Sequence, residues 1–115
     1  MKAYICGVEV EADFLNPDVA EKYEACVESV GTGIQKAGKS KKMSEGIRMQ
    51  CDLVIHCLDD MFGEGSAKKI LGESTDLLAC LDAFEDFCSV YEKYVNPVLS
   101  EKAMAAKARA AMRGA

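Results

Sequence analysis

The chain has 115 residues, half of them hydrophobic, and a formal net charge of −5. This length suits one domain with one hydrophobic core. Its apolar runs are far shorter than the ~20 residues of a membrane span, and the run at the N-terminus is too short for a secretory signal. We therefore expect a cytoplasmic protein with no membrane partner.

The first expected element is a short β-hairpin. Residues 3–6 (AYIC) and 8–14 (VEVEADF) flank Gly7, and the second segment alternates apolar and acidic residues as a half-buried strand does. The triplet Asn16, Pro17 and Asp18 then offers a capping residue, a proline for the first helical position and an acid for the first turn. A helix is predicted from this point until Gly38. Its apolar positions recur at spacings of three and four: Val19, Tyr23, Cys26, Val27, Val30 and Ile34.

Three further helical segments follow a lysine-rich link. The second helix is predicted from Ser44 to Phe62 and the short segment SAKKIL as a further turn, ended by Gly63 and Gly72 respectively. The third main helix should be capped from the cluster Ser74, Thr75 and Asp76, and should carry two apolar stripes over residues 77–95. Asn96-Pro97 should end or kink it.

These elements predict a mainly α fold, in which a short N-terminal β-hairpin precedes a three- to four-helix bundle. Residues 1–96 would form the hairpin and bundle domain. Residues 97–115 are alanine-rich and basic, and we expect a C-terminal helix or tail there. The six cysteines lie among amphipathic segments, so we interpret them as reduced, buried side chains.

Residues 33–40, GIQKAGKS, match the pattern of a phosphate-binding loop. Such a loop follows a buried strand and opens a helix, whereas this segment follows a helical pattern. We therefore expect a helix end and a mobile basic link, with Lys36, Lys39, Lys41 and Lys42 in solvent. A nucleotide-binding protein is the alternative hypothesis.

Other chemical patterns favour a non-enzymatic protein. His56 lies half a turn from the apolar face of its helix and is expected to be solvated rather than catalytic. The cysteine spacings lack the close pairs typical of zinc sites, so we expect no metal and no other cofactor. A net acidic chain whose lysine run contains no aromatic residue disfavours nucleic-acid binding.

The order of VEVEADF, NPDVAEKYEACVESV and FGEGSAKKILGESTDLLACLDAFEDF resembles a family of small proteins encoded by Firmicutes phages and prophages. The resemblance covers roughly residues 4–95. The size and layout of that family are similar to those of tail assembly chaperones, helical proteins that coat the tape measure protein while a phage tail is built. The resemblance implies a non-enzymatic virion-assembly protein in the bacterial host cytoplasm, with a protein partner such as the tape measure protein. An adaptor for one host protein is a further alternative.

The C-terminal half is the predicted interaction region. One apolar stripe of the third helix should remain uncovered and available to another copy: Phe87, Tyr91, Tyr94 and Val95. The basic residues of the tail should dock on an acidic face of a neighbouring subunit: Lys102, Lys107, Arg109 and Arg113. That acidic face is expected near Asp59, Asp60, Asp82 and Glu85, and would give a head-to-tail homo-oligomer. The alternative is a monomer whose tail is a frayed helix.

Overall fold

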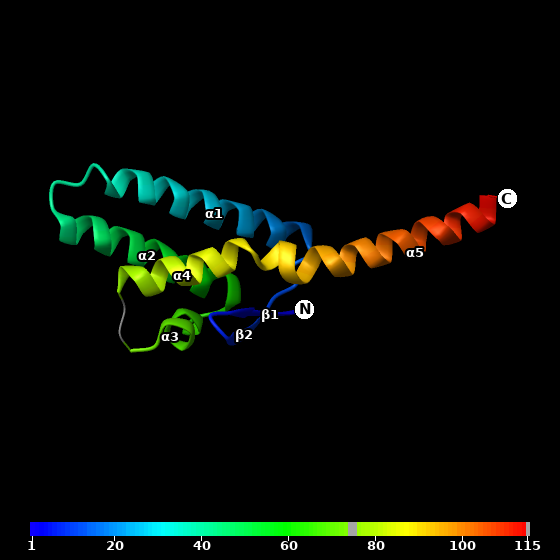
Figure 1. Cartoon of the computed structure of the whole chain (residues 1–115), viewed down its shortest axis with the longest axis horizontal. Coiled ribbons are helices and arrows are strands. Elements are labelled where there is room, and N and C mark those ends of the chain that lie inside the picture. The colour runs from blue at the N-terminus through cyan, green and yellow to red at the C-terminus, as the bar shows by residue number, and fades with distance from the viewer. Residues whose placement is uncertain (74–75, 115) are drawn as a thin grey trace.

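The computed structural model describes residues 1–73 and 76–114. It confirms the predicted fold class, a short N-terminal hairpin followed by helices. The hairpin and the helical body lie together at one end of the molecule, and a long helix projects from them, giving extents of 67 × 27 × 19 Å (Figure 1). The elements in chain order are β1 (Lys2–Ile5), β2 (Val8–Glu11), α1 (Pro17–Ala37), α2 (Met43–Phe62), α3 (Ser66–Leu71), α4 (Leu77–Cys88), the π-helical turn η1 (Tyr91–Val95) and α5 (Asn96–Gly114).

The hairpin packs against α4 through a tight turn. β1 and β2 are antiparallel, with Ile5 opposite Val8, so Cys6 and Gly7 form a two-residue turn. Both turn residues have positive φ, 50° and 79°, as a turn that follows the right-handed twist of a hairpin requires. The Cys6 backbone N–H donates a 2.7 Å hydrogen bond to Asp86 Oδ2 on α4. This bond fixes the turn to the helical body.

The signals predicted for α1 act as expected. Pro17 occupies the first helical position, and Asn16 Oδ1 accepts a 2.8 Å hydrogen bond from the Asp18 backbone N–H. This bond satisfies one of the backbone donors that a helix N-terminus leaves free. The helix runs to Ala37, and Gly38 follows as its C-cap. The predicted boundaries of α1 are therefore confirmed.

α1 and α2 pack closely as an antiparallel helical pair. Gly33 is buried in α1, and a Cβ atom at this position would overlap the Leu53 side chain of α2. Closer to the link between the two helices, a Cβ atom on Gly46 would lie 3.1 Å from the Ala37 carbonyl oxygen. The two glycines thus permit the close approach of the two helices.

Glycines with positive φ and one aspartate set the path around α3. Gly63 ends α2 with a φ of 106°, and Gly65 precedes α3 with a φ of 91°. Gly72 ends α3 with a φ of 78°. Asp76 Oδ1 accepts a 2.7 Å hydrogen bond from the Ala79 backbone N–H and so caps α4. The other two predicted cap residues, Ser74 and Thr75, lie outside the described residues.

An aromatic cluster joins α1, α2, α4 and η1. The Tyr23 ring lies 4.7 Å from the Phe87 ring and 4.6 Å from the Tyr91 ring, measured between centroids. Tyr23 also donates a 2.9 Å hydrogen bond to the Phe87 carbonyl near the end of α4. The largest fully buried side chains of the core are Phe14, Phe87, Ile5, Leu58, Val30, Val54, Val90, Val95 and Cys80.

The third predicted helix is interrupted before Pro97 rather than at this residue. α4 ends at Cys88, the chain passes through η1, and Pro97 lies in the first turn of α5. The Asn96 N–H donates to the Tyr91 carbonyl, five residues earlier, which is the pairing of a π-helix. Because proline lacks a backbone N–H, the first turn of a helix tolerates it well. Asn96-Pro97 therefore begins a new helix.

Candidate protein-interaction surface

α5 is the most exposed element of the described chain. Its side chains from Val98 to Arg113 are all exposed, including Met104 at 70% and Met112 at 79%. Its principal contacts with the rest of the protein are with η1, and Figure 1 shows it projecting away from the other helices. The predicted C-terminal extension is thus a helix with nearly its whole circumference open to a partner.

The four basic residues predicted to bind a partner lie on this helix. Lys102, Arg109 and Arg113 are separated by seven and four residues, so they share one side of α5, whereas Lys107 lies on another. Across residues 1–73 and 76–114, none of these four forms an ion pair with an acid of its own chain. Their charges are therefore free to pair with another molecule. We call Lys102, Arg109 and Arg113 the basic stripe.

The aromatic strip predicted to remain open is instead part of the core. Phe87 is 1% exposed and Val95 is fully buried, while Tyr91 and Tyr94 are half-buried. The hairpin supplies the missing cover, because Tyr94 packs against Tyr4 with ring centroids 6.3 Å apart. The prediction of an available surface is therefore wrong for Phe87 and Val95, which are buried, whereas Tyr91 and Tyr94 remain partly exposed.

The predicted acidic face near Asp59 and Asp60 is also largely committed within the fold. Asp59 Oδ1 accepts a 2.9 Å hydrogen bond from the Ala67 backbone N–H, and Asp60 lies 3.4 Å from the Lys22 ammonium group. Asp59 thus fixes the start of α3 to α2, and Asp60 is occupied by a surface ion pair with α1. The other two residues of that prediction, Asp82 and Glu85, are exposed on α4.

The segment GIQKAGKS has the predicted structure of a helix end and a link. α1 continues through Gly33 to Ala37, so the residues before the motif are helical rather than a strand. Lys36, Lys39, Lys41 and Lys42 are all exposed, which confirms the prediction for the lysines. A phosphate loop follows a buried strand, whereas here α1 takes the place of that strand and α2 begins only at Met43, after the link. The segment does not have the geometry of a phosphate loop.

The cysteines divide into two groups. Cys26, Cys51, Cys57 and Cys80 are buried as predicted, whereas Cys6 and Cys88 are exposed. Burial is the main cause that raises the pKa of Cys57 and Cys80, the latter to about 12, so these thiols are protonated at neutral pH. A protonated thiol is a poor nucleophile and a poor metal ligand.

The remaining titratable candidates do not converge on one site. His56 is exposed, as predicted. Within the described residues there is no group of three or more histidine, cysteine or acidic side chains that could hold a metal ion.

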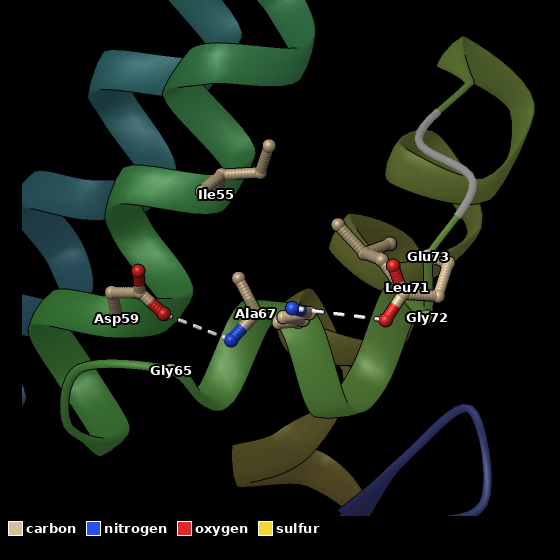
Figure 2. A pocket seen from close by; sticks show the side chains of 8 residues that line it. Ile55, Asp59, Gly65, Ala67, Leu71, Gly72 and Glu73 are labelled. Atoms are coloured by element: carbon tan, nitrogen blue, oxygen red, sulfur yellow. Dashed lines mark hydrogen bonds and ion pairs between the residues drawn. The ribbon is translucent and has the colours of Figure 1, made fainter.

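A hollow of about 330 Å³ lies between α2 and α3 (Figure 2). Its two main polar interactions are internal: Asp59 accepts from the Ala67 N–H, and the Lys68 ammonium lies 3.7 Å from Glu73. No pattern in the sequence indicates this hollow, because it depends on how α3 folds back on α2. Its lining residues are Ile55, Asp59, Gly65, Ala67, Lys68, Leu71, Gly72 and Glu73.

No helix among the described residues combines the length and hydrophobicity needed to cross a membrane. Comparison with curated proteins and with solved structures finds no match. One family model matches residues 6–113, a range that begins in the hairpin turn and includes almost all of α5. The match therefore extends beyond the region of the sequence resemblance. The chain belongs to DUF6673, a family of unknown function.

Proposed function

We propose that this chain is a non-enzymatic assembly protein that binds other proteins, similar in role to a phage tail assembly chaperone and acting in the cytoplasm of a bacterial host. The observation that carries the proposal is α5, a long exposed helix that holds basic and apolar side chains away from the core. The family match supports treating α5 as part of the family's unit, because it extends to residue 113.

An exposed helix of this composition is suited to binding protein. Most of the stability of a protein helix comes from tertiary packing, and α5 has little of it, so a partner that covers one side adds stability. Leu99, Met104 and Met112 supply apolar contacts and the basic stripe supplies charge. Helices that present anchors of both kinds bind in grooves of partner proteins.

The proposed partner is the tape measure protein of the same phage or prophage. This choice rests on the layout of hairpin and helices, which resembles the phage and prophage family named above. The absence of an enzymatic role is part of the proposal, and the protonated buried thiols and the solvated His56 support it.

A capture experiment tests the proposal. The full chain is co-expressed with the tape measure protein encoded in the same gene cluster, and the bound fraction is measured after purification. Reversing the basic stripe (Lys102→Glu, Arg109→Glu, Arg113→Glu) should reduce capture by about tenfold or more, as loss of an interfacial charge cluster does. The matched control reverses Lys39, Lys41 and Lys42, which gives the same change of net charge in the exposed link between α1 and α2. Equal capture by both variants, or none by the wild type, would contradict the proposal.

The two alternatives give different results in companion assays. An adaptor would bind one host protein through α5 and leave the tape measure protein unbound. A nucleotide-binding protein would bind ATP or GTP with magnesium at micromolar concentration and lose that binding in Lys39→Ala. Either result would replace the proposed function.

A further inference from the structure

We propose that α5 of one copy docks on the outer face of α1 and α4 in a second copy. We call this surface the α1–α4 face. It consists of the acids Glu24, Glu28, Glu85 and Glu92 and the apolar residues Val27, Ile34 and Leu81. The inference rests on the proposed function, in which α5 binds protein, and names a second copy of the chain as one of its partners.

The sign of the net charge changes at the start of α5. Residues 1–96 contain ten basic and eighteen acidic side chains, whereas residues 97–115 contain four basic side chains and one acidic. The body and the projecting helix thus have opposite net charge. Opposite charges on two parts of the same chain favour contact between copies and orient that contact.

Glu24 lies where α1 meets η1, because it lines a hollow together with Tyr91. Glu28, one turn later on α1, lines a separate hollow with Met49 and Leu53 of α2. Glu24 lies close enough to Tyr91 for its charge to add to burial in raising the pKa of that tyrosine. On α4, Phe87, the residue before Cys88, packs against Tyr23 of α1 with ring centroids 4.7 Å apart and accepts a 2.9 Å hydrogen bond from its hydroxyl at the backbone carbonyl. Glu85 lies three residues before Cys88 in α4, so it shares that side of the helix. Glu92 follows Tyr91 in η1.

These acids are available to an incoming helix. Glu24, Glu28, Glu85 and Glu92 are all exposed, and none of them forms an ion pair with a base in the part of the chain that the structure describes. By contrast, Asp60 on α2 is already paired with Lys22. The α1–α4 face therefore carries unneutralised negative charge that the basic stripe can offset.

The surface between the acids is apolar and only partly covered. Ile34 is 38% exposed, and Val27 and Leu81 are half-buried. Gly31 lies on the same side of α1 as Val27 and Ile34, and a Cβ atom there would meet no atom within 4 Å. A hollow of about 180 Å³, lined by Ala20, Tyr23, Glu24 and Tyr91, opens at one end of this surface.

α5 has a side that matches this surface. Leu99, Ala103, Ala106 and Ala110 recur at spacings of four, three and four, so they form a stripe of mostly small side chains. The basic stripe lies along one edge of these residues and Lys107 along the other. Small side chains allow two helices to approach closely, and the flanking bases then come within reach of the acids. The spacing also agrees, because Arg109 and Arg113 are four residues apart, as are Glu24 and Glu28, a rise of ~6 Å along a helix.

The receptor is a second copy rather than the same molecule. α5 continues from η1 and leads away from the body, as Figure 1 shows. To reach its own α1–α4 face, the helix would have to break and reverse direction at η1, where Val95 is fully buried. A neighbouring copy can accept the helix without any such rearrangement, and its own α5 remains free for the next copy.

Charge-swapped variants of the full chain test the inference, with mass measured by sedimentation velocity from low to high micromolar concentration at low salt. The wild type should rise from the 12.5 kDa monomer to at least about twice that mass, and association should weaken about tenfold or more at high salt. A tail variant reverses Lys102, Arg109 and Arg113 to Glu, and a face variant reverses Glu24, Glu28 and Glu85 to Lys. Each should remain a monomer. A chain that carries all six changes should associate again, because the charges are complementary once more.

The control chain combines the tail variant with reversal of three exposed acids elsewhere in the body, Glu45, Asp52 and Glu64 to Lys, and should remain a monomer. Far-ultraviolet circular dichroism and urea unfolding establish that each variant is folded. A wild type that stays monomeric, a tail variant that still associates, or a six-fold variant that does not recover would each overturn the inference. A monomeric wild type that captures the tape measure protein would overturn this inference alone. Self-association without such capture would overturn only the partner named under the proposed function.

Discussion

The hydroxyl of Tyr91 donates a 2.6 Å hydrogen bond to the backbone carbonyl of Phe14, which lies 77 positions earlier in the chain. This bond ties η1 to the segment that joins the hairpin to α1. The Phe14 side chain is 1% exposed, so without the hydroxyl its carbonyl would be poorly solvated. We predict that Tyr91→Phe lowers the free energy of unfolding by about 1 to 3 kcal/mol in urea titrations. Tyr4→Phe is the control, since the Tyr4 hydroxyl makes an exposed 3.3 Å bond to Glu9, and should change that free energy by less than about 0.5 kcal/mol.

Phe87 should behave as a core residue and not as an interface residue. Phe87→Ala removes a ring that packs against Tyr23, Phe62 and Phe84, and should lower the free energy of unfolding by about 3 to 5 kcal/mol. Leu78, on the same helix but 71% exposed, is the control, and Leu78→Ala should cost no more than about 0.5 kcal/mol. If Phe87→Ala kept full stability and lost only self-association, the buried assignment would be wrong.

Two neighbouring glycines of α1 should respond differently to the same substitution. Gly31→Ala places a methyl group in open space and should stabilise the helix by about 0.5 to 1 kcal/mol. Gly33→Ala raises helix propensity by the same amount, but its methyl group must displace the Leu53 side chain. We predict that it is less stable than Gly31→Ala by about 1 kcal/mol or more, measured by urea unfolding in the tail variant, in which self-association is absent. Equal stabilities would show that α1 and α2 are not in close contact at Gly33.

Stability should decline at high pH because of the buried thiols. Burial, followed by the hydrogen bond and charge of Cys51, raises the pKa of Cys80 from its ordinary 9.0 to about 12. The folded state therefore retains the proton at pH values where the unfolded chain releases it. The stabilising contribution is complete below pH 9 and is lost as the pH rises from 9 towards 12, by up to about 1.4 kcal/mol per pH unit.

The slope of unfolding free energy against pH measures this effect. Cys80→Ala should make the decline above pH 9 shallower than in the wild type. Cys6→Ala removes an exposed thiol and should change the slope less. The same slope in Cys80→Ala and in the wild type would contradict the assignment of Cys80.

The sequence predicted the helix boundaries well because their signals are local. Asn16 and Asp76 each accept a hydrogen bond from the first turn of the helix that follows, and Gly63 and Gly72 end helices with positive φ. Each of these signals depends on only a few neighbouring residues. The exposure of Lys102 and Arg109 also followed from local composition, since the tail has few large apolar residues.

The errors concern contacts between residues far apart in the chain. Tyr94 belongs to an apolar stripe, and periodicity alone could not show that Tyr4 of the hairpin covers it. The π-helical turn was missed because its pairing differs from that of an α-helix by one residue and leaves no clear pattern in the sequence. The alternating hairpin residues Ala3 and Ile5 were the available signal that an apolar face had to be buried somewhere, and α4 lies against them.

The most direct test of the central claim, that another protein molecule covers α5, is amide hydrogen exchange across residues 98–113. In the dilute isolated chain these amides should exchange much faster than those of α2, because α5 has few contacts outside η1. In concentrated protein, or with the tape measure protein added, exchange in α5 should slow by about tenfold or more, and in the tail variant it should not. Fast exchange in α5 under all of these conditions would contradict the account, as would full protection of α5 in the dilute monomer.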